Sequence, residues 1–169
     1  MYGNRIDGDS LKESYAVTRS ENFTEESKRR IVGGNQVLSQ GHSDEIYLKA
    51  RALRTQIMEH FAQDFQEVSV IISPVSPTAA PEVGASLKDP LAMYLNDIAT
   101  IPVNMAGIGG MSLPSGLADE DGLPVGFQIM SPVMKDERMY SVGAALEAAL
   151  LSKWGAPLLD KAPIMGGAR

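Results

Sequence analysis

The clearest periodic pattern in the chain follows Ser43 and Asp44, where apolar side chains recur at steps of three and four residues. This spacing places them on one face of an α-helix. The pattern therefore predicts an amphipathic helix that packs on a core through Ile46, Ala50, Leu53, Ile57, Phe61 and Phe65.

Three short runs predict β-strands. Residues 68–73 are mostly β-branched and end at Pro74, which is typical of a buried strand in a sheet covered by helices. Residues 111–116 and 124–130 flank the segment LADEDG, in which the pair Asp121-Gly122 suits a turn that needs a positive φ angle.

Further helices are predicted by their end signals. Thr24 can cap a helix whose body contains Gly33-Gly34, and two glycines that cost about 1 kcal/mol each inside a helix indicate a kink or tight packing. Asp89-Pro90 is a favourable helix start, and that helix should end at about Ala99. Residues 137–151 place Met139, Val142, Leu146 and Leu150 on one helical face.

Helices interleaved with strands indicate the α/β fold class, and 169 residues with 44% hydrophobic content fall within the size of one domain. Residues 1–22 are polar and rich in turn-forming residues, so we expect an irregular segment there. The domain should span residues 23–152, with a C-terminal tail over residues 153–169.

The composition of the chain limits the kinds of partner that it can bind directly. A net charge of −6 argues against a broad basic surface, so any nucleic acid would have to contact a partner protein. The chain contains no cysteine, which excludes disulfides and thiolate ligands and fits the cytoplasm. The polar first residues do not resemble a secretory signal, and no apolar run is long enough to span a membrane.

The usual catalytic and metal-binding motifs are missing from the sequence. The two histidines, His42 and His60, belong to no H-E-x-x-H motif, and no G-x-S-x-G motif accompanies them. Gly107 to Gly110 lack the lysine and hydroxyl that a phosphate loop needs, and a strand follows them, so a tight turn is the better interpretation. We therefore predict no catalytic residue and no metal site in this chain.

Two charged residues are candidates for ligand binding. Asp97 lies near the predicted C-terminal end of a helix, where an acid is unfavourable by a few tenths of a kcal/mol up to about 1 kcal/mol, which indicates a cationic partner. Arg30, in the run Lys28-Arg29-Arg30, can offer a planar guanidinium to a carboxylate. Each also fits a solvated surface residue.

Five segments of the chain carry a family likeness: ESKRRIVGG, YLKARALRTQI, VIISPVSPTAAP, DPLAMYLNDIATIPVNMAGIGGMSLPSG and GLPVGFQIM. They resemble the C-terminal part of the amidase signature enzymes, and the likeness spans roughly residues 2–151. The segment most specific to the glutamine-hydrolysing A subunits of tRNA-dependent amidotransferases is DPLAMYLND. Residues 33–36 and 41–44 depart from a more apolar family pattern, and Ser115 stands where a cysteine is common.

The resemblance implies an α/β/α sandwich around a mixed sheet, of which this chain forms the C-terminal portion. It also implies hydrolysis of glutamine to ammonia, which the B and C subunits use to convert Glu-tRNA(Gln) or Asp-tRNA(Asn) to the amide. ATP and Mg are used by the partner subunit, and none of these cofactors is expected in this chain. Contact with tRNA is expected only through the partner.

The same resemblance assigns roles to the two charged residues. Arg30 matches the arginine that binds the α-carboxylate of glutamine, and Asp97 matches the acid that binds its α-amino group. The family's serine nucleophile, its second serine in a cis peptide and its lysine lie upstream of the matched region. The chain alone should therefore be inactive.

Two alternatives remain open. The chain can belong to a general amidase that acts on a neutral amide, for which a pair of Arg30 and Asp97 has no obvious use. It can also be a non-enzymatic α/β interaction module that retains only the scaffold.

Overall fold

The computed structural model describes residues 3–39, 43–82 and 94–160, and the chain divides between Ala52 and Leu53 into two compact units. The first unit contains two helices and the start of a third. The second contains the rest of that third helix and a three-stranded sheet. The predicted domain boundaries at residues 23 and 152 stay a prediction.

The expectation of an irregular segment over residues 1–22 is wrong for its second half, which forms helix α1 (Leu11–Asn22). Ser10 caps this helix, since its Oγ accepts a hydrogen bond from the Glu13 backbone nitrogen at 3.1 Å. In return, Glu13 Oε2 accepts from the backbone nitrogen of Asp9 at 3.0 Å. These reciprocal bonds resemble a capping box, which satisfies backbone donors at a helix start.

Helix α2 (Glu25–Val37) begins as predicted, because the side chain of Thr24 accepts from the backbone nitrogen of Ser27 at 3.3 Å. The helix continues through Gly33 and Gly34. A Cβ atom added at either glycine would meet open space. None of the described residues therefore packs tightly against these glycines.

The predicted amphipathic helix is α3 (Leu48–Glu67), which a π-helical turn, η1 (Ser43–Tyr47), precedes. Its predicted docking on a core is only partly realised, since no residue of α3 is buried and Leu53 is 60% exposed. Within the second unit, Ile57, Phe61 and Phe65 are half-buried on one face.

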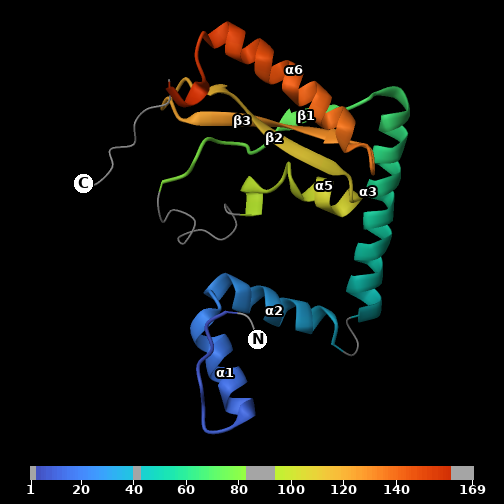
Figure 1. Ribbon diagram of the computed structural model, residues 1–169. Coiled ribbons are helices and arrows are strands. Elements are labelled where there is room, and N and C mark those ends of the chain that lie inside the picture. The colour runs from blue at the N-terminus through green and yellow to red at the C-terminus, as the bar shows by residue number, and fades with distance from the viewer. Residues whose placement is uncertain (1–2, 40–42, 83–93, 161–169) are drawn as a thin grey trace, which may run out of the picture. The chain divides into compact units, whose positions relative to one another are not determined.

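The sheet of the second unit consists of β1 (Ile71–Pro74), β2 (Gly109–Leu117) and β3 (Pro124–Ser131), in the order β1-β3-β2 (Figure 1). Both pairings are antiparallel, so the described strands do not themselves form the mixed sheet that we expected. The strand predicted as buried has alternating burial, and among the described strands it pairs with β3 alone, so it lies at the edge of this three-stranded sheet.

The turn between β2 and β3 confirms the prediction from its sequence. Gly122 has φ 70°, a conformation that glycine adopts without strain. Asp121 Oδ1 accepts from the backbone nitrogen of Leu123 at 2.9 Å, as aspartate does in turns.

Helices cover both faces of this sheet (Figure 1). On one face lies α6 (Asp136–Trp154), where a Cβ atom on Gly143 would meet the side chains of Met111 and Leu113. On the other face lies α5 (Ile101–Ala106), since a Cβ atom on Gly110 would lie 3.0 Å from Val103 Cγ1. The α/β/α layering is therefore confirmed in this unit.

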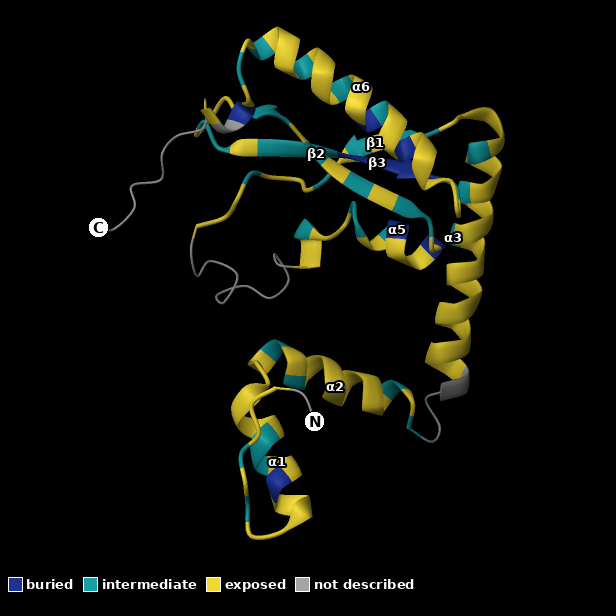
Figure 2. Ribbon diagram, viewed as in Figure 1, coloured by how far each residue is buried: buried dark blue, intermediate teal, exposed yellow. Residues whose placement is uncertain are grey.

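The buried apolar side chains gather where these layers meet, chiefly on β3, α5 and α6 (Figure 2). Within the described parts of the chain, the buried hydrophobic residues are Val103, Ala106, Ile129, Met130, Met139 and Leu158. None of the described helices is both long and apolar enough to cross a membrane.

Candidate functional site

Asp97 lies at the start of a turn over residues 97–100, directly after helical residues 94–96. Its position at a helix end is as predicted, whereas the predicted start at Asp89-Pro90 falls outside the described residues. The backbone carbonyl of Asp97 accepts from the backbone nitrogens of Thr100 at 3.0 Å and Ile101 at 2.9 Å. These bonds connect the turn to α5.

The Asp97 side chain is exposed, and its carboxylate forms no hydrogen bond or ion pair with any residue that the structure describes. A carboxylate in this setting is open to a cationic ligand such as an ammonium group, which it can bind through charge-assisted hydrogen bonds. The role of Asp97 in binding an ammonium group stays a prediction.

Gln128, on the central strand β3, fastens this turn to the sheet. Its Nε2 atom donates to the backbone carbonyl of Ala99 at 2.6 Å and to Ser73 Oγ at 2.9 Å. The residue is only 5% exposed. It was not among the residues predicted from the sequence, although an amide in the middle of the apolar run GFQIM was a signal that could have been noticed.

Gln128 belongs to a polar row that crosses the sheet. Its register partners are Ser73 on β1 and Ser112 on β2, so the three side chains project from the same face. That face carries α5 and the turn that contains Asp97, whereas the opposite face carries α6 and apolar residues such as Leu113.

Arg30 lies on α2 in the first unit. Its Nε donates to Glu26 Oε1 at 2.8 Å, and the Arg30 side chain remains 63% exposed. Arg29 also bonds to the Glu26 carboxylate. Lys28 pairs with Glu25 at 2.9 Å, and the hydrogen bond and positive charge of Lys28 hold the pKa of Glu25 below its usual value.

Both predicted binding residues are exposed. Arg30 lies along helix α2, and Asp97 lies at a helix end. Arg30 belongs to the first unit and Asp97 to the second, and each unit is described by itself. Their pairing around one ligand therefore stays a prediction.

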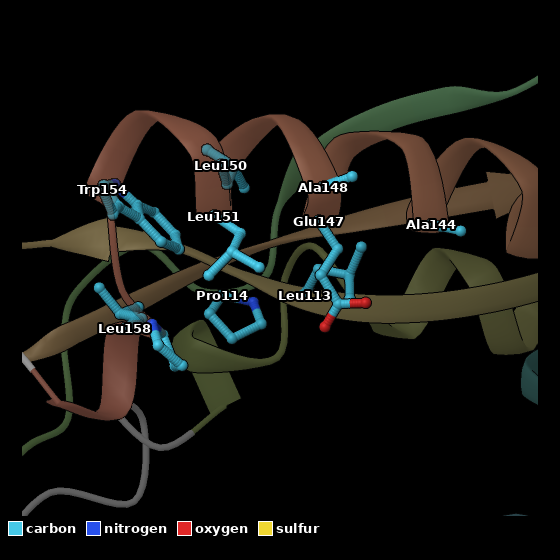
Figure 3. A pocket seen from close by; sticks show the side chains of 10 residues that line it. Leu113, Pro114, Ala144, Glu147, Ala148, Leu150, Leu151, Trp154 and Leu158 are labelled. Atoms are coloured by element: carbon cyan, nitrogen blue, oxygen red, sulfur yellow. The ribbon is translucent and has the colours of Figure 1, made fainter.

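An apolar groove of about 430 Å³ lies on the α6 side of the sheet (Figure 3). In Figure 3, Leu151, Trp154 and Leu158 turn toward Pro114, and Glu147 is the only charged residue among the ten that line the groove. A zwitterion such as an amino acid needs a fixed cation as well as a fixed anion. The groove lacks that cation among its lining residues, so it is a poor candidate for the amino-acid site.

The histidines and glycines considered in the sequence analysis form no catalytic or metal-binding site among the described residues. His60 is exposed on α3, and His42 lies outside the described residues. The glycines after α5 form a tight turn, as predicted, since Gly107 is its left-handed C-cap and β2 starts at Gly109. Across residues 3–39, 43–82 and 94–160, no group of acidic or histidine side chains is arranged to hold a metal ion.

Comparison with known proteins identifies the protein family of this chain. The family model described as Amidase matches residues 2–140. A solved structure of the glutamyl-tRNA(Gln) amidotransferase A subunit from Thermotoga maritima is 34% identical, with a TM-score of 0.60, over 80% of this chain and 29% of that one. The chain belongs to the amidase family.

Within this family, the chain is similar to proteins of one name. The glutamyl-tRNA(Gln) amidotransferase A subunit of Streptomyces avermitilis is 50% identical over 165 residues, which is 96% of this chain and 33% of the relative. The protein of the same name from Paenarthrobacter aurescens is 51% identical over 154 residues, covering 91% and 30%. The chain thus spans about a third of the length of these relatives, and it matches their C-terminal third.

Proposed function

We propose that this chain forms the glutamine-recognition part of the A subunit of a tRNA-dependent amidotransferase. The observation that carries the proposal is an identity of about 50% to proteins of that name along nearly the whole chain. The exposed carboxylate of Asp97, which is presented at a helix end, supports it independently.

In this proposal, Arg30 binds the α-carboxylate of glutamine and Asp97 binds its α-ammonium group. A fixed cation and a fixed anion recognise the two charged ends of a free amino acid and orient its side-chain amide. The serine nucleophile, the second serine and the lysine are supplied by polypeptide that corresponds to the upstream part of the relatives. Hydrolysis there releases ammonia from the amide.

The partners follow from the same proposal. B and C subunits receive the ammonia, and the partner subunit uses ATP and Mg to convert a tRNA-bound glutamate or aspartate to its amide. Contact with tRNA is made through that partner, as the chain's net charge of −6 favours. The reaction belongs to protein biosynthesis and takes place in the cytoplasm.

A chimera tests the proposal. The upstream two-thirds of the Streptomyces avermitilis relative is fused to this 169-residue chain, and the product is purified with the partner subunits of that organism. We expect glutamine hydrolysis. Replacing Asp97→Asn should raise the KM for glutamine at least about tenfold, because loss of a charge-assisted contact typically costs about 1.5–3 kcal/mol.

The matched control is Asp119→Asn, which removes another exposed acid, in the turn between β2 and β3. It should leave the KM unchanged. If the Asp97→Asn chimera hydrolyses glutamine with an unaltered KM, the assigned role is wrong.

Two further assays separate the alternatives. A general amidase would hydrolyse a neutral amide such as propionamide in the chimera as well as glutamine, and Asp97→Asn would not affect it. The isolated chain should not hydrolyse glutamine at all, so turnover that is lost in Asp97→Ala would reveal a nucleophile within the chain.

A further inference from the structure

The side chain of Gln128 connects two segments that are far apart in sequence. It lies on the central strand of the sheet, and its Nε2 uses one N–H bond for the carbonyl of Ala99 and the other for Ser73 Oγ. Ser73 Oγ in turn donates to the carbonyl of Pro74 at 3.1 Å. Burying an amide is unfavourable unless its donors are paired, and here both are.

The segment that Gln128 holds is closed around the backbone of Asp97. The Asp97 carbonyl accepts from the backbone nitrogens of Thr100 and Ile101 and from Thr100 Oγ1 at 3.2 Å. Residues 97–101 therefore form one hydrogen-bonded turn. The carbonyl of Ala99 projects from this turn to Gln128, which fixes the turn against the sheet.

From this arrangement we infer that Gln128 is a positioning residue for ligand binding by Asp97. The inference rests on the proposed function and adds a residue to its site. Gln128 does not contact the ligand. It holds the backbone from which the exposed carboxylate projects.

Positioning matters here because no described side chain restrains the Asp97 carboxylate itself. A binding group that is ordered before the ligand arrives loses less conformational entropy when the ligand binds. For an exposed carboxylate on a turn, the only such restraint from the described residues acts through the backbone of residues 97–101, and Gln128 supplies the side-chain bond from the sheet.

The first experiment replaces Gln128→Met in the chimera, which keeps the length of the side chain and removes both donors. The KM for glutamine should rise about tenfold, because a hydrogen bond that holds the turn is lost. The kcat should change much less. Hydrogen exchange should become faster at the amides of Thr100 and Ile101. An unchanged KM with faster exchange would overturn the inference.

A second variant guards against simple loss of folding. Gln128→Glu has the same shape, but an ionised carboxylate cannot donate to Ala99, so it should raise the KM as Gln128→Met does. The control is Ser115→Ala, which removes another side-chain bond of the same strand pair, from Ser115 Oγ to the carbonyl of Val125 at 3.2 Å. The control should leave the KM unchanged.

A double mutant separates positioning from general stability. If Gln128 acts through Asp97, the KM of the Asp97→Asn/Gln128→Met chimera should equal that of Asp97→Asn alone. A further tenfold increase in the double mutant would show that Gln128 acts independently. If Asp97→Asn itself has no effect, the proposed function fails; if only the Gln128 variants have none, that function stands and the positioning role is wrong.

Discussion

Glu26 holds the side chain of Arg30 through a bond of 2.8 Å between Glu26 Oε1 and Arg30 Nε. The two residues are four positions apart on α2, so they lie on the same face of the helix. Because Glu26 also bonds to Arg29, one carboxylate orients both guanidinium groups. The pair of Glu26 and Arg30 depends only on residues of α2, so its formation needs no ligand.

We expect Arg30→Lys in the chimera to raise the KM for glutamine roughly tenfold or more, although the charge is kept. A lysine ammonium cannot form the two parallel hydrogen bonds that a guanidinium offers to a carboxylate. The measurement is steady-state glutamine hydrolysis. Arg29→Lys is the matched control, since Arg29 shares Glu26 but has no proposed contact with the ligand. Equal effects of the two variants would contradict the role of Arg30.

Gly109→Ala should destabilise the chain by about 1–3 kcal/mol, the usual cost of overpacking. A Cβ atom at this position would lie 2.6 Å from Ser131 Oγ and 3.1 Å from Asp136 Oδ1. Urea denaturation measures the change. Gly116→Ala serves as the control, because a Cβ atom there meets nothing within 4 Å.

The same contact predicts that substitutions at Gly109 and Ser131 affect stability non-additively. Ser131 is 0% exposed, and its Oγ has no hydrogen-bond partner among the described residues. Ser131→Ala should be neutral or stabilising, since it removes an unpaired buried polar atom. In the Ser131→Ala background, the cost of Gly109→Ala should become smaller. Strictly additive effects in urea denaturation would count against a direct clash.

Ser10→Ala should cost about 1 kcal/mol in the stability of α1, because it removes the side chain that caps the helix. Faster hydrogen exchange over the first turn of α1 measures this loss. Ser20→Ala is the control, since Ser20 lies inside the same helix and its Oγ donates to the carbonyl of Val17 within that helix. If both variants exchange alike, the cap does not hold the helix.

The pKa of Glu25 is lowered mainly by the hydrogen bond from Lys28. A lowered pKa means that this pair stabilises α2 above the ordinary glutamate pKa, and that the contribution is lost as the pH falls through the lower folded value. Lys28→Met should return the pKa of Glu25 toward its usual value. An NMR titration of the Glu25 side chain in both proteins measures this, and identical titration curves would refute it.

Features set by neighbouring residues were predictable from the sequence. Thr24 starts α2 and Gly122 completes the hairpin turn because a cap and a left-handed turn depend on a few adjacent residues. The end of a helix near Asp97 was predictable for the same reason. The capping pattern of Ser10 and Glu13 was equally local, and it was overlooked.

Features that depend on strand order were not predictable in this way. The run from Val68 to Ser73 has the composition of a buried strand, yet of the strands that the structure describes only β3 pairs with β1, which places β1 at the edge of this sheet. Likewise, the apolar face of α3 predicts a helix but not how much of it the rest of the chain covers. Composition describes a strand or helix, whereas its neighbours decide its burial.

The sequence by itself determined helices α2, α3 and α6, the hairpin, the family and the two charged residues proposed to bind the ligand, because each depends on local patterns or on recognisable segments. Only the tertiary structure decided that Gln128 reaches the turn after Asp97, since 29 residues of chain separate Gln128 from Ala99. That contact exists because antiparallel pairing places Gln128 at the centre of the sheet, on the face that α5 and the turn cover.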